Sequence, residues 1–367
     1  MSVHQFNLTR RRFLKTTAAV ASGMALSSCG WTLAQVKPTP TQSASDTLYI
    51  YTFSGYTDRE LFDTFTTNTG VKVVADIYDS NETMLAKMQA GGGAAYSIIY
   101  PSDYMVRQMK ALKMLAQLEH SRINNLENLL PQFKNPGYDL GNRYSVPVSW
   151  GTTGLIYNRK KLKDPPEDWD YLWQHQQQLS RRITLVNDVR EVMGAVLRML
   201  GYSYNSTNPQ QLQQAYEKLR TLKPAIASFT TDAWKEQILA GDLSISMGFS
   251  ADAVEVSQEN AELQYVIPRS GTSLWTDTMV IPKTAPNVDA AYAWMDFMLQ
   301  PAVAASVCER LNFATPNQPA IKQLSPEKRS NPSLYPPDSI LAKCERVEPL
   351  GKFGEVYDRY WTNLTSG

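Results

Sequence analysis

The chain of 367 residues is predicted to fold as an α/β protein, because stretches typical of strands and of helices alternate along it. Runs rich in β-branched and aromatic residues at 48–53, 71–78 and 96–100 predict three strands, and a helix-like segment follows each of them. This repeated strand–helix order is typical of a doubly wound parallel sheet. A second α/β pattern begins near residue 182, and the length is enough for two domains with sizeable cores.

Capping signals mark the ends of the helices in this first part. A serine, threonine or aspartate is expected just before the first helical residues, and a glycine commonly ends a helix. The predicted helices begin at 57–60, 80–84 and 101–104, and they end at Gly70, Gly91–Gly93 and Lys113.

Aromatic and hydroxyl side chains follow two of these predicted strands. Phe53, Ser54 and Tyr56 come directly after the first strand, and Ser102 and Tyr104 come after the third. The carboxyl ends of parallel strands meet at one edge of a sheet, and ligands bind in the crevice outside that edge. We therefore expect these five side chains to converge there.

The elements of the second part are predicted from the same signals. Two extended runs, 144–148 and 151–158, do not follow the strand–helix order of the first part. They mark a candidate crossing between domains. Residues 273–277 precede a strand at 278–281. The other predicted strands are 182–186, 243–249 and 263–268, and the predicted helices are 209–222, 232–239 and 288–299.

An acidic turn joins the strand 182–186 to an apolar segment of helical length, 192–200. Asp188 and Glu191 in this turn are three residues apart, so their carboxylates project to one side of the first helical turn. Asp-x-x-Glu is the pattern of an N-cap with a capping box, and taken alone the pair is best explained as a cap. The alternative is a seat for a cation, because the helix N-terminus offsets two like charges only in part.

Other side chains favour the cation seat. Phe249 ends a predicted strand, and Trp275 and Asp277 lie in the segment before another one. Carboxylates form charge-assisted hydrogen bonds with amines, while aromatic faces attract cations and cover methylene groups. Together with Asp188 and Glu191, these side chains would suit a cationic ligand, or a polyamine if they are spread along a channel.

The first 28 residues are predicted to be an export signal peptide and not part of the fold. Residues 9–15 resemble a twin-arginine motif, and the apolar stretch 18–26 is too short to span a membrane. Residues 26–29 resemble a bacterial lipobox, in which Cys29 would be lipidated; the alternative is a chance cysteine after a plain signal peptide. Residues 29–47, rich in Pro, Thr and Ser, then predict a flexible tether. We therefore expect a periplasmic lipoprotein, anchored to the membrane after twin-arginine export.

The charge balance is close to neutral and does not suggest binding to nucleic acid. Removing residues 1–28 would leave 32 of the 36 Lys and Arg residues against 35 Asp and Glu, because that segment holds four basic residues and no acidic one. This mild acidic excess permits a cationic ligand without requiring one. With Cys29 modified, Cys308 and Cys344 remain, and the sequence leaves open whether they pair or stay free thiols.

No pattern of catalytic residues stands out, so the protein is not expected to be an enzyme. Its three histidines, His4, His120 and His175, form no triad or zinc motif, and the sequence contains neither a Gly-x-Ser-x-Gly motif nor a P-loop. A glycosidase uses carboxylates that flank the bond it breaks, whereas Asp188 and Glu191 would face the same side of a sugar. Neither a cofactor nor a metal site is predicted.

Seven short segments resemble the periplasmic spermidine/putrescine-binding proteins of ABC importers, and the resemblance covers nearly all of the chain after residue 47. The most specific parts are Asp-x-Arg-Glu at 188–191 and Trp-x-Asp at 275–277. The segments are 48–51, 78–84, 100–104, 187–192, 200–203, 275–282 and 314–317.

The resemblance implies a two-lobed periplasmic-binding-protein fold, in which each lobe is a mainly parallel sheet flanked by helices and the chain crosses between the lobes at a hinge. The first lobe would comprise 48–150 plus 277–321, and the second 151–276 plus 322–367. Closure of the hinge would trap a polyamine, spermidine or putrescine, between the lobes. Such a receptor would act as a monomer and deliver its ligand to the membrane permease of an ABC importer.

The resemblance also implies the ligand contacts. Asp188, Glu191 and Asp277 match the carboxylates that hold amines in this family, and Trp275 matches an aromatic wall. The complete set of implied ligand-binding residues is Phe53, Ser54, Tyr56, Ser102, Tyr104, Asp188, Glu191, Phe249, Trp275, Asp277 and Phe313.

Several positions depart from the family pattern. Phe53 and Phe249 stand where the family usually has tryptophan, and Phe313 stands where it often has tyrosine. These changes keep a stacking face but remove a hydrogen-bond donor and weaken the attraction for a cation. Gly55 replaces an acidic residue of some members, and the alignment near Val347 is loose, so the length of the preferred polyamine stays open.

The alternative function is binding of another cationic solute, such as ferric iron or a quaternary amine. Iron would need a cluster of oxygen or tyrosinate ligands. Two aspartates and a glutamate beside Trp275 do not resemble such a cluster.

Overall fold

Nine strands form one sheet in the computed structural model, which describes residues 46–366. Their order is β2-β1-β3-β9-β4-β7-β5-β6, and β8 pairs with β4 beside this row. The strands are β1 (Thr47–Thr52), β2 (Lys72–Ile77), β3 (Ile98–Ile99), β4 (Ser145–Asn158), β5 (Ile183–Leu185), β6 (Ile226–Phe229), β7 (Ile245–Phe249), β8 (Leu263–Val266) and β9 (Leu274–Val280).

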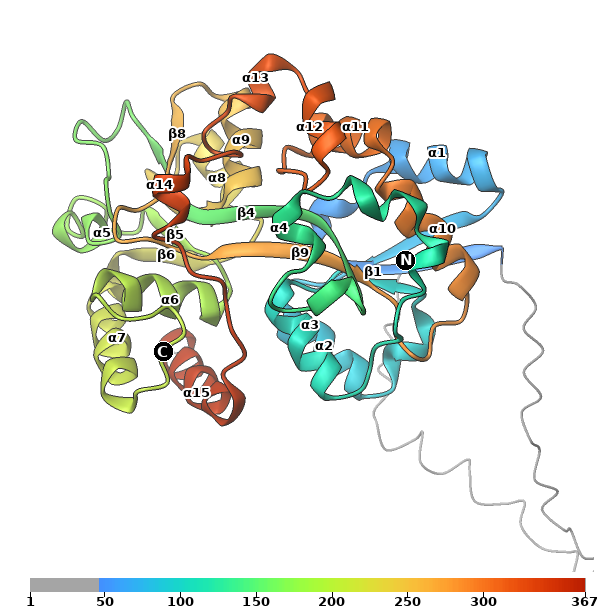
Figure 1. The fold of residues 1–367 in the computed structure, drawn as a ribbon. Helices are drawn as coiled ribbons and strands as arrows, with labels where there is room; N and C mark the ends of the chain where they lie inside the picture. Colours follow the sequence, from blue (N-terminus) through green and yellow to red (C-terminus); the bar gives the residue numbers. More distant parts are fainter. Residues whose placement is uncertain (1–45, 367) are drawn as a thin grey trace, which may run out of the picture. The chain divides into compact units, whose positions relative to one another are not determined.

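The sheet has two halves, which the strands β4 and β9 connect (Figure 1). In the first half β1 pairs in parallel with β2 and β3, and in the second half β5 pairs in parallel with β6 and β7. Residues 145–152 of β4 pair with β9, whereas residues 153–158 pair with β7 or β8, all in antiparallel orientation. One strand therefore belongs to both halves. This arrangement confirms the predicted two-lobed α/β fold, with one lobe built on each half.

The structure corrects two details of the predicted strands. The two extended runs around residue 150 form the single strand β4, whose register shifts between Pro147 and Ser149. Pro147 cannot donate a backbone hydrogen bond, so an irregularity beside it lets the strand continue. Trp275 and Asp277 lie within β9 and not before it, because pairing with β4 extends the strand back to Leu274.

Helices cover both faces of each half of the sheet (Figure 1). Buried side chains of α1 and α10 form the core on one face of the first lobe, and those of α2 and α3 form the core on the other. In the second lobe α6, α7 and α15 cover one face, and α8 and α9 cover the opposite one. The helices are α1 (Arg59–Thr69), α2 (Asn81–Gln89), α3 (Asp103–Ala111), α4 (Pro131–Lys134), α5 (Tyr171–Gln174), α6 (Val189–Met199), α7 (Pro209–Leu222), α8 (Trp234–Ala240), α9 (Ser250–Glu259), α10 (Val288–Met298), α11 (Pro301–Leu311), α12 (Gln318–Gln323), α13 (Pro326–Arg329), α14 (Asp338–Leu341) and α15 (Gly354–Thr365).

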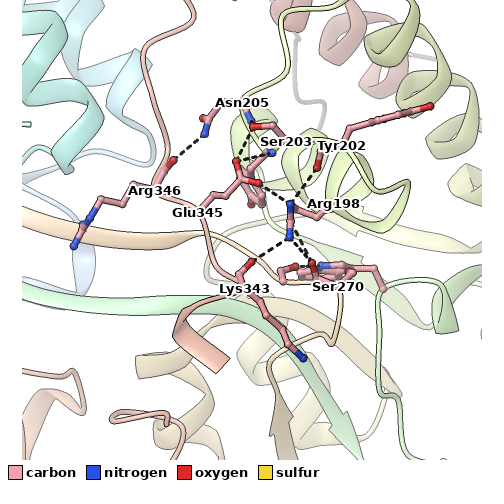
Figure 2. A network of polar contacts seen from close by, with 11 residues as sticks. Arg198, Tyr202, Ser203, Asn205, Ser270, Lys343, Glu345 and Arg346 are labelled. Carbon is pink, nitrogen blue, oxygen red and sulfur yellow. Dashed lines mark hydrogen bonds and ion pairs between the residues drawn. The ribbon is translucent and has the colours of Figure 1, made fainter. Parts of the chain in front are cut away.

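Residues 343–348 provide a third connection between the lobes. Arg198 on α6 forms an ion pair with Glu345 at 2.7 Å and donates hydrogen bonds to the carbonyl oxygens of Ser270 and Lys343 (Figure 2). Glu345 also accepts hydrogen bonds from the Ser203 hydroxyl and from the backbone N–H of Tyr204. These contacts fix the segment to the second lobe.

The next residue of this segment reaches the first lobe. The Arg346 guanidinium donates to the Asp103 carboxylate at 2.8 Å and to the Thr276 hydroxyl at 2.8 Å. The backbone carbonyl oxygen of Arg346 accepts a hydrogen bond from the Asn205 amide of the second lobe (Figure 2). Since α3 begins at Asp103 and β9 contains Thr276, a single arginine links both lobes close to the strand ends.

The C-terminal part of the chain contributes to both cores. Leu324 and Leu334 pack in the cluster that contains α1 and α10, and Tyr357 and Leu364 pack in the cluster that contains α6 and α7. The predicted boundaries after residues 150 and 276 fall inside β4 and β9. The boundaries of the lobes stay a prediction.

Some sequence-based predictions fall on residues that the structure does not describe. The twin-arginine signal, Cys29 and nearly all of the tether lie outside residues 46–366. Within the described part, Cys308 is buried, Cys344 is partly buried and both are free thiols, which answers the open question about their pairing. No helix in this part is long and apolar enough to cross a bilayer.

Candidate functional site

The two lobes line a cavity of about 550 Å³ at the carboxyl ends of their parallel strands. The structure brings all of the ligand-binding residues implied by the sequence to this one cavity. They are Phe53, Ser54, Tyr56, Ser102, Tyr104 and Phe313 from the first lobe, and Asp188, Glu191, Phe249, Trp275 and Asp277 from the second lobe and from β9.

Asp277 lies where the first lobe meets β9. Its carboxylate accepts hydrogen bonds from the Ser102 hydroxyl at 2.6 Å and from the Tyr56 hydroxyl at 2.8 Å. Tyr56 also contacts the Ser149 hydroxyl, and Ser102 accepts from the Asn81 amide. Both oxygens of Asp277 are thus held in place by neutral donors.

The environment of Asp277 leaves it ready for a cation. Burial raises the pKa of this carboxyl to about 6, although the hydrogen bonds from Ser102 and Tyr56 act in the opposite direction. The residue is only 9% exposed, and no ion pair within residues 46–366 involves it. Near neutral pH the protein therefore holds a largely ionised carboxylate in a buried place without a counter-charge, which is costly unless a cation binds there.

Asp188 caps helix α6, as its sequence pattern predicts. Its Oδ1 accepts from the backbone N–H groups of Arg190 at 2.8 Å and Glu191 at 3.1 Å. Burial raises the pKa of the Asp188 carboxyl, whereas these two hydrogen bonds and the charge of Arg190 act in the opposite direction. Oδ2 has no hydrogen-bond partner in the described part of the chain, so the cap leaves half of the carboxylate free for a ligand.

Glu191 does not complete the capping box. Its Oε2 accepts from the hydroxyls of Tyr204 and Ser273, both at 2.7 Å, and does not turn back to the start of the helix. Burial, and then the charge of Asp188, raise the pKa of Glu191 to about 7. The Tyr204 ring lies against Gly194, where a Cβ atom would approach the ring within 2.1 Å, so this glycine allows the tyrosine to reach Glu191.

Aromatic side chains form the apolar wall of the cavity. Trp275 and Phe249 meet edge to face with their centroids 5.9 Å apart, and Tyr56 packs on Phe313 at 5.1 Å. A Cβ atom at Gly151 would lie 2.4 Å from the Trp275 ring, so the indole depends on a glycine in the neighbouring strand. These faces suit the methylene groups and the charge of an alkyl ammonium.

The cavity also contains charged residues that the sequence analysis did not select. Among the described residues, eight carboxylates but only two cationic side chains line it. One signal could have identified two of the carboxylates: Asp252 and Glu255 follow Phe249 with the same spacing of three as Asp188 and Glu191. Asp232 and Lys235 have no comparable local signal. The lining residues missed by sequence reasoning include Asp79, Asp103, Asp232, Lys235, Asp252, Glu255 and Arg310.

The two cationic side chains are already paired. Arg310 forms ion pairs with Asp58 and Glu60 of the first lobe. Lys235 lies 3.4 Å from Asp252 and 3.0 Å from Glu255. Asp188, Glu191 and Asp277 form no ion pair with any side chain of residues 46–366. The cavity therefore offers uncompensated negative charge, and a cationic solute is the ligand that suits it.

Comparison with known proteins identifies the family. The sequence profile described as bacterial extracellular solute-binding protein matches residues 60–335, three quarters of the chain. The chain belongs to this family. The matched range includes strands of both halves of the sheet.

Named relatives of this binding protein narrow the comparison. It is 36% identical over 327 residues to the spermidine/putrescine-binding periplasmic protein of Salmonella typhimurium. The matched region covers 89% of this chain and 93% of the relative. The protein of the same name from Escherichia coli is 34% identical over 325 residues, or 88% and 92% of the two chains. A solved structure from Listeria monocytogenes, described as a putative spermidine/putrescine ABC transporter, is 39% identical with a TM-score of 0.84, over 87% of this chain and 99% of that one.

Proposed function

We propose that this protein is an extracytoplasmic receptor that binds a polyamine, spermidine or putrescine, between its lobes and delivers it to the permease of an ABC importer. One observation carries the proposal: Asp188, Glu191 and Asp277 line one cavity, and none of them forms an ion pair within residues 46–366. The names of the relatives from Salmonella and Escherichia agree with this ligand class.

The chemistry of a polyamine matches both kinds of wall. Each ammonium would form charge-assisted hydrogen bonds with the carboxylates, worth roughly 1.5–3 kcal/mol apiece. Contact with Trp275 or Phe249 would add about 0.5–2 kcal/mol, and the methylene groups would lie against the same rings. A neutral solute would leave the carboxylates buried without a counter-charge, so it would bind poorly.

The proposed receptor works by closure of the lobes around its ligand. β4, β9 and residues 343–348 connect the lobes and would act as the hinge. Residues 1–28 would direct export by the twin-arginine route and Cys29 would carry the lipid anchor, so that the protein acts outside the cytoplasmic membrane as a monomer. No catalytic step, cofactor or nucleic acid is part of this function.

Ferric iron and quaternary amines are less suitable solutes. The cavity tyrosines Tyr56 and Tyr104 donate hydrogen bonds to Asp277 and Glu82, and burial raises their pKa well above the ordinary value. They are therefore neutral phenols and not the tyrosinates that suit iron. A quaternary amine carries one charge and no N–H donor, so it cannot satisfy three carboxylates.

Isothermal titration calorimetry of the purified protein tests the proposal. Putrescine, spermidine, choline and ferric citrate are titrated separately at pH 7.5. We expect a dissociation constant in the micromolar range or below for at least one polyamine and no measurable binding of the other two solutes. Binding of choline or iron without any binding of a polyamine would overturn the proposal.

A further inference from the structure

The second lobe presents two acidic pairs to the cavity from adjacent strands. β5 and β7 pair in parallel, so α6 and α9, which follow them, begin at the same edge of the sheet. Asp188 and Glu191 come from the start of α6, and Asp252 and Glu255 come from the first turns of α9. Among the described residues, only the second pair forms ion pairs with a cationic side chain.

Lys235 supplies that cation. Its Nζ lies 3.4 Å from Asp252 and 3.0 Å from Glu255, and its side chain is 24% exposed. Burial lowers the pKa of the Lys235 ammonium, but Asp252 and Glu255 raise it by more, so the net shift is upward and the side chain stays charged. The preceding residue, Trp234, is fully buried and fixes the start of α8, which holds the lysine in position.

The group around Lys235 is separate from the amine-holding carboxylates. The pKa of Asp252, raised by burial to about 6, is affected by the charges of Lys235, Glu255 and Asp232. The pKa of Glu191 is affected instead by Asp188. Within residues 46–366 no hydrogen bond or ion pair joins Lys235, Asp252 or Glu255 to Asp188, Glu191 or Asp277. Asp232 accepts a hydrogen bond from Ser54 of the first lobe, so this second group lines the same cavity where the lobes also meet.

We propose that Lys235 determines which polyamines fit, because its ammonium occupies the place that an additional ammonium of a longer linear polyamine would take beside Asp252 and Glu255. A ligand ammonium brought to this end would meet a like charge and two carboxylates that are already paired. The protein therefore favours short polyamines over a tetraamine such as spermine. This inference rests on the proposed polyamine-binding function.

Replacing the lysine by a neutral residue of similar length tests this role. In Lys235→Met, Asp252 and Glu255 lose their cation and become available to the ligand. The dissociation constants of spermidine and spermine are measured by competitive calorimetry for the wild type and the variant. We expect the ratio of spermine to spermidine affinity to rise at least tenfold in Lys235→Met, and Lys235→Arg, which keeps the charge, to retain the ratio of the wild type.

Two further variants make the outcome decisive. Lys160→Met removes a lysine of the same lobe that pairs with Glu262 at 3.3 Å and whose side chain is 74% exposed, so it controls for net charge and should leave the ratio unchanged. Lys235→Gln repeats the test in case Lys235→Met fails to fold in thermal denaturation. A ratio within threefold of the wild-type value in the folded variant would overturn the role of Lys235. If the wild type binds no polyamine, the proposed function itself fails, which is a different result.

Discussion

The two strand-to-helix turns after β5 and β7 resemble each other in sequence and differ in what they hold. Both place two acidic residues three positions apart in the cavity, next to aromatic side chains. At α6, Asp188 caps the helix and Glu191 is held by the neutral hydroxyls of Tyr204 and Ser273. At α9, the pair is neutralised in part by the ammonium of Lys235.

This difference shows what an acidic pair needs to become a ligand site. Two carboxylates attract a cationic ligand only where the fold does not supply the counter-charge. Neutral donors such as Tyr204 orient Glu191 without neutralising it, so its charge stays available. The same local pattern therefore leaves a pair without an ion-pair partner at one turn, which is the proposed ligand seat, and gives a lysine-paired one at the next.

Removing the unpaired carboxylates should have the largest effect. We expect Glu191→Ala and Asp277→Ala each to weaken spermidine binding tenfold or more, since each removes a charge-assisted hydrogen bond to the ligand. Glu255→Ala should change the affinity by only about threefold, because Lys235 already compensates that carboxylate. Calorimetry on the three variants, with thermal denaturation to check folding, measures the contrast. Equal losses of affinity in Glu191→Ala and Glu255→Ala would contradict the proposed difference between the two acidic pairs.

Asp188→Asn should separate the cap from the charge. An asparagine oxygen can still accept from the N–H groups of Arg190 and Glu191, so the free energy of unfolding should change by less than about 0.5 kcal/mol. Spermidine binding should nevertheless weaken tenfold or more, because the negative charge is lost. Asp188→Ala should weaken binding similarly and also lower the free energy of unfolding by about 1 kcal/mol. An Asp188→Asn protein that binds normally would reduce Asp188 to a cap.

The affinity should fall with decreasing pH. In the ligand-free protein the pKa of Glu191 is about 7 and that of Asp277 about 6, and a bound ammonium would lower both. Binding is therefore strongest above pH 7, where both carboxyls are ionised, and it is lost as protons compete below that. We expect binding of spermidine to be about ten- to a hundredfold weaker at pH 5.5 than at pH 7.5, with the larger figure if the complex keeps both carboxyls ionised. Titrations at pH 6.5 in buffers of different ionisation enthalpy should detect release of protons, and a constant affinity across this range would contradict the assignment.

Tyr204→Phe should weaken binding less than the loss of Glu191, Asp277 or the Asp188 charge. It removes the hydroxyl that orients Glu191 at 2.7 Å, and losing one hydrogen bond of about 1 kcal/mol corresponds to about fivefold in affinity. Tyr357→Phe is the matched control, because its buried hydroxyl likewise donates a hydrogen bond, but to the Ser206 carbonyl and not to a carboxylate of the cavity. Tyr357→Phe should lower the free energy of unfolding by about 1 kcal/mol, as Tyr204→Phe does, but it should bind spermidine like the wild type. Equal binding losses in the two variants would assign the effect to the core and not to Glu191.

Features encoded by neighbouring residues could be predicted from the sequence. The predicted limits of the helix at 209–222 agree with α7, since Asn208 caps it and Pro209 starts it. Asp58 and Gly70 bound α1 for the same local reasons. The Asp-x-x-Glu pattern correctly predicted that Asp188 caps a helix. Every residue that the family resemblance implied as a ligand contact lines the cavity.

Features that depend on distant residues could not be predicted in this way. β4 continues through residue 150 because β9, more than a hundred residues later, pairs with it. Glu191 turns from the helix start to Tyr204 and Ser273, and nothing in the acidic turn indicates these partners. Lys235 meets Asp252 and Glu255 only because α8 and α9 pack on the same face of the sheet. The repeated spacing of Asp252 and Glu255 was visible, but the cation between them was not.

A crystal structure of the protein with bound spermidine tests the central claim most directly. We predict ligand ammonium groups within hydrogen-bonding distance of Glu191 and of Asp277, with the methylene groups against Trp275 and with the Lys235 ion pairs to Asp252 and Glu255 intact. A ligand amine that displaces Lys235 from these carboxylates, or a complex in which no amine approaches Glu191, would contradict it.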